Sequence, residues 1–276
     1  MIYDCFLYFD EDMILDLRLN TLDSVVDKFV IVESTHTFTG KNKTLNFDIN
    51  KFNKFKEKII YIVFDESPDN NPWDNEAKNR NAIMRGLAGA EDDDLILISD
   101  IDEIFKPQAI SKIKRQNLCT ILLQNFYNYQ FNLQVFNADG SPRKAGLAKA
   151  VSLKNLRGFF RGEPETVRNV KRKNSTVRRS WLKWKWLKFN TSIIKDGGWH
   201  FSWIMTAHRI SEKMSSISHT EYDTPEFNNP DHIMKALSNA EDIWGRERNL
   251  VKQALTKPTF PDYLVDNKEQ YKNFIV

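Results

Sequence analysis

Residues 92–105 read DDDLILISDIDEIF. The aliphatic residues 95–98 form an apolar run typical of a buried strand, and Asp100, Asp102 and Glu103 follow it directly. A chain that has entered the core on such a run should not emerge into a cluster of like charges unless a cation neutralises them. This strand and its acidic end therefore decide both the fold and the site. The three acids before the strand, 92–94, fit a solvated turn at its opposite end.

Asp100 and Asp102 are two positions apart, so their side chains lie on the same side of an extended chain. Two neighbouring carboxylates repel each other and are driven towards protonation unless a cation intervenes. A divalent metal is the simplest such cation, and ligation by oxygen favours Mg²⁺ or Mn²⁺ over zinc. The alternative is a solvated turn, which is the usual setting of an isolated Asp-x-Asp.

Strand and helix patterns alternate through the first hundred residues. Apolar runs predict strands at 2–9, 29–32, 59–64 and 95–99, and spacing near 3.6 predicts helices at 13–26 and 75–87. This alternation predicts an α/β fold with a mostly parallel sheet flanked by helices on both faces. Ligands of such sheets bind beyond the carboxyl ends of the strands, which places Glu33, Asp65 and the Asp100–Glu103 cluster on one rim.

The second half of the chain is less regular. Further strands are predicted at 119–124 and 146–153, and helical segments within 230–255. Neither an internal repeat nor a linker is evident. We therefore expect one domain over residues 1–276.

Residues 197–203, GGWHFSW, form a second informative stretch. Paired glycines permit backbone conformations and close approaches that other residues resist. His200 is a candidate third metal ligand beside Asp102, on a loop that closes over a sugar nucleotide, and Trp199 and Trp203 suit stacking on sugar rings. The alternative is a packed aromatic turn with a hydrogen-bonded histidine.

Composition excludes several classes. The 276 residues carry a net charge of +3, too close to balance to indicate a nucleic-acid partner. Cys5 and Cys119 fit neither a disulfide framework nor a zinc site, which favours a reducing compartment. The N-terminal segment MIYDCFLYFDEDM is not a signal peptide, and no window approaches the roughly 20 apolar residues of a membrane-spanning helix. We expect a soluble, cytoplasmic protein.

Several ordered stretches together resemble glycosyltransferase family 17. They begin with YDCFLYFDE and LRLNTLDSVVDKFVIVESTHTFTGK, continue through NEAKNRNAIMRGL and DLILISDIDEI, and resume at GGWHFSW, SSISHTEYDTPEF and PDYLVDNKEQY. The resemblance covers nearly the whole chain apart from about residues 155–190.

The resemblance implies a GT-A-type transferase that inverts the anomeric centre, uses a divalent metal, commonly Mn²⁺, and moves a sugar such as GlcNAc from a nucleotide sugar such as UDP-GlcNAc to a glycan acceptor. In such an enzyme residues 1–105 would bind the nucleotide sugar, and residues 106–276 would bind the acceptor and include the C-terminal helices. Asp100-Ile101-Asp102 then matches the Asp-x-Asp motif, with Asp102 as direct metal ligand and Asp100 nearer the ribose or a bound water. His200 matches the histidine of the family's Gly-Trp-His segment. The animal enzymes carry a membrane anchor that this sequence lacks, so we expect a glycan assembled in a bacterial cytoplasm or in the host cytoplasm of a virus.

Further residues are candidates for binding the nucleotide-sugar donor. Arg80, Asn81 and Arg85 precede the metal strand and suit a diphosphate, a ribose or a uracil, because guanidinium groups offer a planar fork of donors. The alternative is a solvated helix face with Glu76 and Arg80 paired at i, i+4. Glu33 ends the run FVIVE and is a candidate nucleoside ligand, or else a capping or loop residue.

An inverting reaction requires a general base that takes the proton of the acceptor hydroxyl. Glu163, beside Pro164 at a predicted helix start, and Glu221, within SHTEYD, are the two candidates. Each also has a purely structural interpretation.

The stretch RRSWLKWKWLKF, 178–189, alternates lysines with tryptophans. Lysine and tryptophan together suit an anionic membrane surface or an acidic acceptor, so residues 178–188 are a candidate for peripheral membrane contact. The plainer interpretation, which we favour from the sequence, is a strand with its tryptophans facing inwards and its lysines facing water.

Two other functions fit an Asp-x-Asp at a strand end. A sugar-phosphate nucleotidyltransferase would consume a nucleoside triphosphate and release pyrophosphate, whereas a glycosyltransferase releases a nucleoside diphosphate. A carbohydrate- or nucleotide-binding module without turnover is the other alternative.

Overall fold

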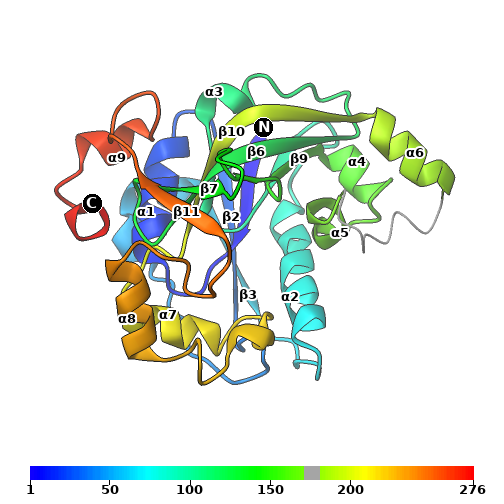
Figure 1. Ribbon diagram of the computed structural model, residues 1–276. Helices are drawn as coiled ribbons and strands as arrows, with labels where there is room; N and C mark the ends of the chain where they lie inside the picture. Colours follow the sequence, from blue (N-terminus) through cyan, green and yellow to red (C-terminus); the bar gives the residue numbers. More distant parts are fainter. Residues whose placement is uncertain (171–180) are drawn as a thin grey trace.

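The computed structural model describes residues 1–170 and 181–276. Its strands belong to one curled sheet (Figure 1), whose main path has the order β11-β7-β6-β9-β4-β1-β2-β3. Off this path, β10 pairs with β5 and β6, and β8 pairs with β6. The strands are β1 (Ile2–Leu7), β2 (Lys28–Ser34), β3 (Ile59–Phe64), β4 (Leu95–Ile98), β5 (Glu103–Phe105), β6 (Cys119–Asn128), β7 (Leu133–Asn137), β8 (Lys144–Ala145), β9 (Lys149–Ser152), β10 (Thr191–Ser202) and β11 (Arg248–Lys252).

Helices pack around this sheet. The α-helices are α1 (Asp12–Leu22), α2 (Pro72–Asn81), α3 (Pro107–Ile110), α4 (Leu153–Arg157), α5 (Pro164–Arg168), α6 (Trp181–Phe189), α7 (Ala207–Met214), α8 (Pro230–Ser238) and α9 (Asp262–Asp266). The 3₁₀ segments are η1 (Ile49–Lys58), η2 (Ala82–Leu87), η4 (Thr220–Tyr222) and η5 (Lys272–Phe274). None of these described helices is both long and apolar enough to cross a bilayer.

The predicted α/β class is confirmed, and alternation along the buried strands explains why both faces are covered. Phe29 and Ile31 of β2 join a core with the apolar side of α1, whereas Val30 and Val32 join a second core with Ile83 of η2. Successive strand residues point to opposite faces, so a strand of consecutive apolar residues needs cover on both.

The parallel part of the sheet is β3-β2-β1-β4, and it places the candidate rim. Pairs β1–β2, β1–β4 and β2–β3 are parallel, so Leu7, Ser34 and Ile98 all lie at the same edge. Beyond β4 the sheet is mixed: β9 runs antiparallel to both β4 and β6, while β10 runs parallel to β6. Both sequence halves therefore contribute strands to one sheet.

Three local predictions were wrong. The Trp-Lys stretch from 181 onwards is helix α6 rather than a strand, while 178–180 lie outside the described residues. Residues 248–252, expected within a helical segment, form β11, which pairs with β7. Residues 197–202, expected in a turn or loop, form the end of the 12-residue strand β10.

The two glycines of β10 have the predicted role of close approach. A Cβ at Gly198, whose φ is +147°, would lie 2.1 Å from the carbonyl oxygen of Ile104, and one at Gly197 would lie 2.6 Å from Cβ of Leu122. Such distances are far below contact distance. Only glycines allow β10 to lie this close to both β5 and β6.

Candidate active site

A cavity of about 560 Å³ opens at the carboxyl edge of the parallel strands. Its wall comes from the segments after β1 and β2, from α2 and α5, from the Asp100–Asp102 turn, from the end of β10, and from α7 with the segment 216–219. Among the described residues, its lining includes seven carboxylates and five lysines and arginines. The imbalance leaves the cavity suited to a bound cation.

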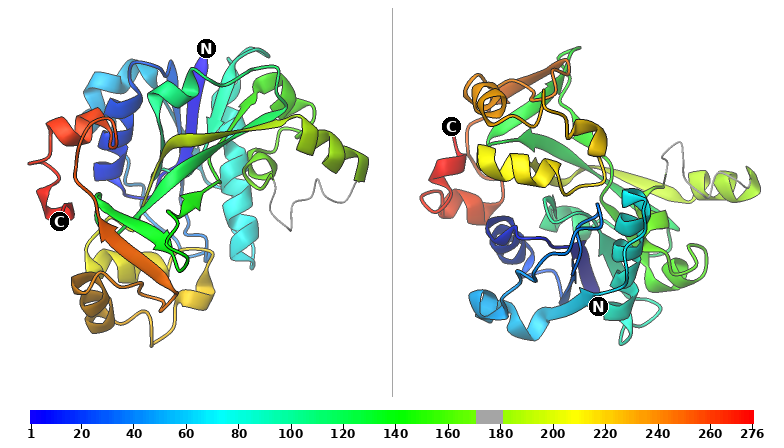
Figure 2. Two further views of the ribbon diagram at one scale, coloured as in Figure 1. Left: turned by 45° about the horizontal axis from the view of Figure 1, so that its top comes forward. Right: turned by 90° about the horizontal axis from the view of Figure 1, so that it is seen from below.

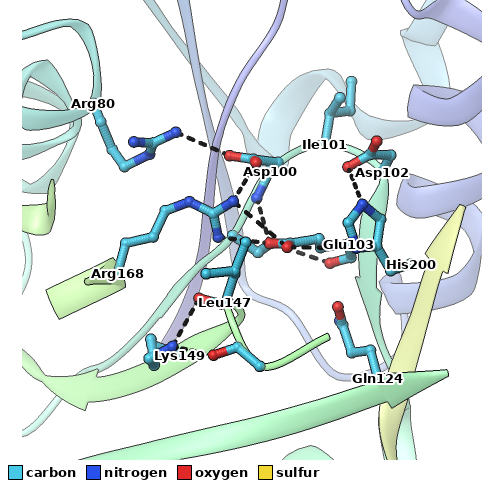
Figure 3. Close-up of polar contacts among 12 residues, drawn as sticks. Arg80, Asp100, Ile101, Asp102, Glu103, Gln124, Leu147, Lys149, Arg168 and His200 are labelled. Carbon is cyan, nitrogen blue, oxygen red and sulfur yellow. Dashed lines mark hydrogen bonds and ion pairs between the residues drawn. The ribbon is translucent and has the colours of Figure 1, made fainter. Parts of the chain in front are cut away.

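Asp100 is held by two arginines of this chain. Its Oδ1 accepts a hydrogen bond of 3.0 Å from Nη2 of Arg80, and its Oδ2 pairs with Nη2 of Arg168 (Figure 3). Burial by itself would raise the pKa of Asp100, but the two guanidinium groups, Arg168 first, hold this pKa well below its usual range. Asp100 is therefore ionised and already neutralised by protein groups.

Arg80 joins α2 to the rest of this network. Its Nη2 donates to Glu76 at 2.8 Å, and its Nη1 pairs with Glu165 of α5. The i, i+4 pair between Glu76 and Arg80 that the sequence allowed is thus present, but on the buried wall of the cavity rather than on a solvated face.

Arg18 of α1 supports the acidic turn from beneath and was not identified from the sequence. Its side chain is completely buried; Nε and Nη2 donate to Asp4 at 2.7 and 2.6 Å. Its Nη1 lies 2.7 Å from the carbonyl oxygen of Asp100 and 3.0 Å from that of Ile101. The turn backbone is therefore fixed by a charged group that the protein core surrounds.

Glu103 completes the turn. Its Oε2 accepts from the backbone N–H of Asp100 at 3.0 Å and from Nη1 of Arg168 at 2.8 Å. The side chain is fully buried, so it cannot reach a ligand directly. Of the three acids in the cluster, Asp102 is left as the one whose carboxylate has no arginine partner among the described residues.

Asp102 faces His200. Strand β10 pairs antiparallel with β5 in a register that sets His200 opposite Glu103, and the N–H of Phe201 donates to the carbonyl of Asp102 at 2.8 Å. Nε2 of His200 lies 3.6 Å from Oδ1 of Asp102, and both residues line the cavity (Figure 3). The predicted proximity of residues about a hundred positions apart is present.

The charges of this pair are coupled. Burial would raise the pKa of Asp102, but His200 lowers it below its ordinary value. Burial would lower the pKa of His200, but the nearby carboxylates, Asp102 first and then Glu103, raise it. Nδ1 of His200 is buried and has no hydrogen-bond partner among residues 1–170 and 181–276; Oε1 of Glu103 is 3.8 Å away.

The donor set fits a divalent metal in part. One carboxylate and one imidazole that face each other across 3.6 Å are suitable ligands for Mn²⁺ or Mg²⁺, and a buried ring nitrogen next to a carboxylate is typical of a histidine whose other nitrogen binds metal. No group of three His, Cys, Asp or Glu side chains in the described parts of the chain forms a complete metal site. Asp102 and His200 would therefore hold the ion together with ligand or water oxygens, and Asp100 would not bind it directly.

Glu33, which the sequence predicted to bind the nucleoside, does not line the cavity. Both oxygens of Glu33 are occupied inside the protein, by Lys43 Nζ and the N–H of Asn46 on one side and by Tyr61 and the N–H of Phe47 on the other. Glu33 thus anchors the segment 43–47, which is the structural alternative noted from the sequence.

Asn81 and Arg85 also lie away from the lining. Oδ1 of Asn81 accepts from the N–H of Glu165, and Arg85 pairs with Glu66 in a partly exposed ion pair. Of the three candidates on this helical segment, only Arg80 reaches the cavity.

Neither candidate base lines the cavity. Glu163 is exposed at the N-terminus of α5, where it accepts a hydrogen bond from the hydroxyl of Thr166. Glu221 is exposed and lies 2.6 Å from Nδ1 of His219; burial would raise the pKa of Glu221, but this contact lowers it. The geometry therefore gives the base role of these two residues no support.

Trp199 and Trp203 have different surroundings. Trp199 is buried in the core and donates from Nε1 to the carbonyl of Thr259 at 2.7 Å, so its expected stacking on a sugar was wrong. Trp203 lines the cavity and remains available for such a contact. Trp73, which the sequence did not single out, lines it as well and packs edge-on against His219.

Comparison with known proteins identifies the family. The family model described as glycosyltransferase family 17 matches residues 1–150. A human β-1,4-mannosyl-glycoprotein 4-β-N-acetylglucosaminyltransferase is 24% identical over 231 residues, which are 76% of this chain and 42% of that protein. The rat protein of the same name is 22% identical over 286 residues, which are 94% of this chain and 51% of the rat protein.

The chain thus spans about half the length of these curated relatives, or less. Among solved structures, a putative glucose-1-phosphate thymidylyltransferase from Bacillus anthracis in complex with sucrose has a TM-score of 0.36 and 11% identity, over 71% of this chain and 88% of that one, a similarity too low to carry an inference. Because the family model covers more than half of its residues, including the strand and the acidic turn of the site, this chain belongs to glycosyltransferase family 17.

Proposed function

We propose that this protein is a metal-dependent, inverting glycosyltransferase that moves GlcNAc from UDP-GlcNAc to a glycan acceptor. The observation that carries the proposal is the Asp102–His200 pair, which faces the cavity at the carboxyl edge of the parallel strands in a chain of family 17. The names of the human and rat relatives support GlcNAc as the transferred sugar.

In this proposal, different residues of the cavity bind the metal ion and position its ligands. A divalent cation between Asp102 and His200 would offset the charge that develops on the diphosphate leaving group. Arg80 and Arg168 keep Asp100 ionised and fixed, which leaves Asp102 free to face the ligand. Glu103 accepts from the turn backbone, and its Oε1 lies 3.8 Å from Nδ1 of His200, beyond hydrogen-bond distance, so it acts on the imidazole through its charge.

Lys213 of α7 is a further cation next to this pair. It lies 3.3 Å from Oε1 of Glu11, and although burial would lower its pKa, Glu11 and then Asp102 raise it, so the ammonium stays charged. A cation fixed in advance on the cavity wall suits a diphosphate oxygen, because no reorganisation is needed when charge develops there.

The cysteines suit a cytoplasmic setting for this reaction. Cys5 and Cys119 are both buried and carry thiols rather than a disulfide, which is usual in a reducing compartment.

A thermal-shift experiment tests the donor. Melting temperatures would be measured with UDP-GlcNAc, UDP-glucose, GDP-mannose and UDP, each with and without Mn²⁺. We expect stabilisation by UDP-GlcNAc only when Mn²⁺ is present; ligand at a hundred times its Kd should add about 2.7 kcal/mol to the free energy of unfolding. The same shift without metal would contradict metal dependence, and no shift with any nucleotide sugar would contradict the transferase.

A product assay separates the proposal from its rivals. With an N-glycan acceptor present, we expect release of UDP that depends on the acceptor. Pyrophosphate released from a nucleoside triphosphate and a sugar phosphate would indicate a nucleotidyltransferase instead. Donor binding without release of either product, across a panel of glycan acceptors, would indicate a binding module.

A further inference from the structure

Helix α6 carries an unusual exposed surface. Four of its bulky apolar side chains are largely open to solvent: Trp181 at 62%, Leu182 at 71%, Trp186 at 60% and Phe189 at 80%. The helix projects from the body of the molecule in the views of both ribbon figures (Figures 1 and 2). Soluble proteins scatter such residues singly, and a group of four on one short helix indicates a contact surface.

The helix is nevertheless tied to the fold. Leu187 is buried and belongs to the second core, the one that also contains Val30 and Val32 of β2. The hydroxyl of Thr191 donates to the carbonyl of Leu187 at 2.6 Å, and the carbonyl of Asn190 accepts from Leu118 at 2.9 Å at the start of β6. The exposed face of α6 is therefore held in a defined orientation by the opposite face.

The apolar side chains share one side of α6. With about 100° of rotation per residue, the four exposed residues fall within an arc of roughly 140°, and Leu187 lies on the opposite side. Lys183 and Lys188 border this arc, and Lys185 lies within it. Nζ of Lys185 is 3.9 Å from the ring of Trp181, and Nζ of Lys188 is 5.5 Å from that of Trp184.

We propose that this face of α6 docks on an anionic lipid surface. A helix with tryptophan, leucine and phenylalanine on one face and lysines along its borders lies in the plane of a bilayer interface, with its rings among the headgroups and its ammonium groups on lipid phosphates. The charge argues against a second copy of this chain as the occupant. Two such faces would bring Lys185 and Lys188 of both copies together, and α6 carries no carboxylate to neutralise these four ammonium groups.

The docking face is separate from the cavity. Strand β10 begins two residues after α6 and leads to His200, nine residues further on, a distance of roughly 30 Å along an extended strand. The helix would therefore tether the protein at a surface while the cavity stays free for its ligands. This inference does not depend on the proposed function, and the two fail in different experiments.

Flotation with vesicles tests the proposal. The full chain would be mixed with vesicles of phosphatidylcholine alone or with about 30% phosphatidylglycerol, at low and high salt. We expect flotation with the anionic vesicles that weakens as salt rises, because each lysine near the surface contributes about fivefold to binding. Failure to float with anionic vesicles at low salt overturns the proposal.

Matched variants assign the contact to α6. Trp181→Ser with Trp186→Ser should weaken flotation about tenfold or more, and Lys183, Lys185 and Lys188→Gln should remove its dependence on anionic lipid. The control variants are Leu45→Ser with Met234→Ser, and Lys235, Lys252 and Lys268→Gln, which alter exposed residues elsewhere. Equal losses in the α6 variants and the controls overturn the assignment.

A second readout separates insertion from other contacts. Vesicles with brominated acyl chains should quench tryptophan fluorescence of the native chain, and the Trp181, Trp186 variant should lose this quenching while it keeps its melting temperature. Light scattering gives the oligomeric state without lipid. A dimer that the same two substitutions dissociate, with no quenching by brominated lipid, shows that a second copy occupies the face and overturns the proposal.

Discussion

Arg168 binds Asp100 and Glu103 with one guanidinium group: Nη1 donates to Oε2 of Glu103 at 2.8 Å, and Nη2 pairs with Oδ2 of Asp100. Arg168 belongs to α5, 65 residues beyond Glu103, so the acidic turn is closed by a distant element. Much of the acidic cluster is thus neutralised by protein cations. The cation predicted from the sequence therefore stays a proposal for Asp102 and His200 alone.

Removal of Arg168 should therefore destabilise the protein. Arg168→Met leaves the buried Glu103 without its guanidinium partner, and the loss of one member of a buried pair costs roughly 3–5 kcal/mol in the free energy of unfolding. Urea denaturation would measure this change. Arg157→Met is the control, because Arg157 pairs with Asp92 in an exposed ion pair worth about 1 kcal/mol or less. Equal effects of the two substitutions would contradict the central role of Arg168.

The first half of the fold could be predicted because its signals are local. Runs such as Leu95–Ile98 and Ile59–Phe64 are apolar on both sides, and only strands covered on both faces need that composition. Strand β10 was missed because its first half, Thr191–Asp196, is largely polar and its glycines resemble a turn. What makes it a strand is pairing with β6 and β5, which local sequence does not encode.

The site was predictable to the same extent. Asp102 and His200 each lie next to a clear local signal, an acidic strand end and a Gly-Gly pair. Arg18 and Arg168 gave no such signal, because an arginine in a short amphipathic segment looks like a surface residue until the fold buries it. Glu163 was predicted from its place beside Pro164, whereas the glutamate that lines the cavity is Glu165, two positions further along the chain, in α5.

Substitution by asparagine should have different effects at Asp102 and at Asp100. Asp102→Asn removes the proposed direct ligand and should weaken Mn²⁺ binding at least about tenfold, while melting in the absence of metal changes little. Asp100→Asn should instead lower the melting temperature, because Arg80 and Arg168 lose the carboxylate that they share. Titration calorimetry with Mn²⁺ in the presence of UDP, together with thermal melting, would measure both. Native Mn²⁺ affinity in Asp102→Asn would exclude Asp102 as a ligand.

Substitution of each candidate base by glutamine tests its role. Because Glu163 and Glu221 are exposed and lie outside the cavity lining, Glu163→Gln and Glu221→Gln should each keep kcat within about threefold of the native value. A base that removes the acceptor proton contributes about a hundredfold or more. Release of UDP in the presence of acceptor would be the assay, and a loss of that size in one variant alone would identify it as the base despite its position.

Glu76 should make stability depend on pH. Burial would raise the pKa of Glu76, but Arg80 and the hydroxyl of Ser218 hold it below its ordinary value. A carboxylate whose pKa is lower in the folded state stabilises the protein above the unfolded pKa of about 4.3, and this contribution disappears as the pH falls through the folded pKa. Glu76→Gln should thus be less stable than the native protein at about pH 7, and the difference should shrink towards about pH 3.

Urea denaturation at a series of pH values would measure this difference. Glu66→Gln is the matched control, because Glu66 pairs with Arg85 at the surface and should contribute about 1 kcal/mol or less at any pH. A gap between native and Glu76→Gln protein that stays constant from neutral to acidic pH would show that Glu76 acts through packing rather than through its charge.

Gly198 should tolerate no side chain. Its φ of +147° already disfavours any other residue, and an added Cβ would meet the carbonyl oxygen of Ile104 at 2.1 Å and the backbone nitrogen of Lys106 at 3.0 Å. Neither partner is a flexible side chain, so β10 would have to move away from β5, and His200 would move with it. Gly198→Ala should cost at least about 3 kcal/mol, whereas Gly89→Ala, with nothing within 4 Å, should cost less than about 1 kcal/mol. Gly198→Ala could unfold at the same urea concentration as the native protein and yet lose Mn²⁺ binding, which would show that the glycine serves only to position His200. If neither stability nor Mn²⁺ binding changes, β10 does not lie as close to β5 as the structure has it.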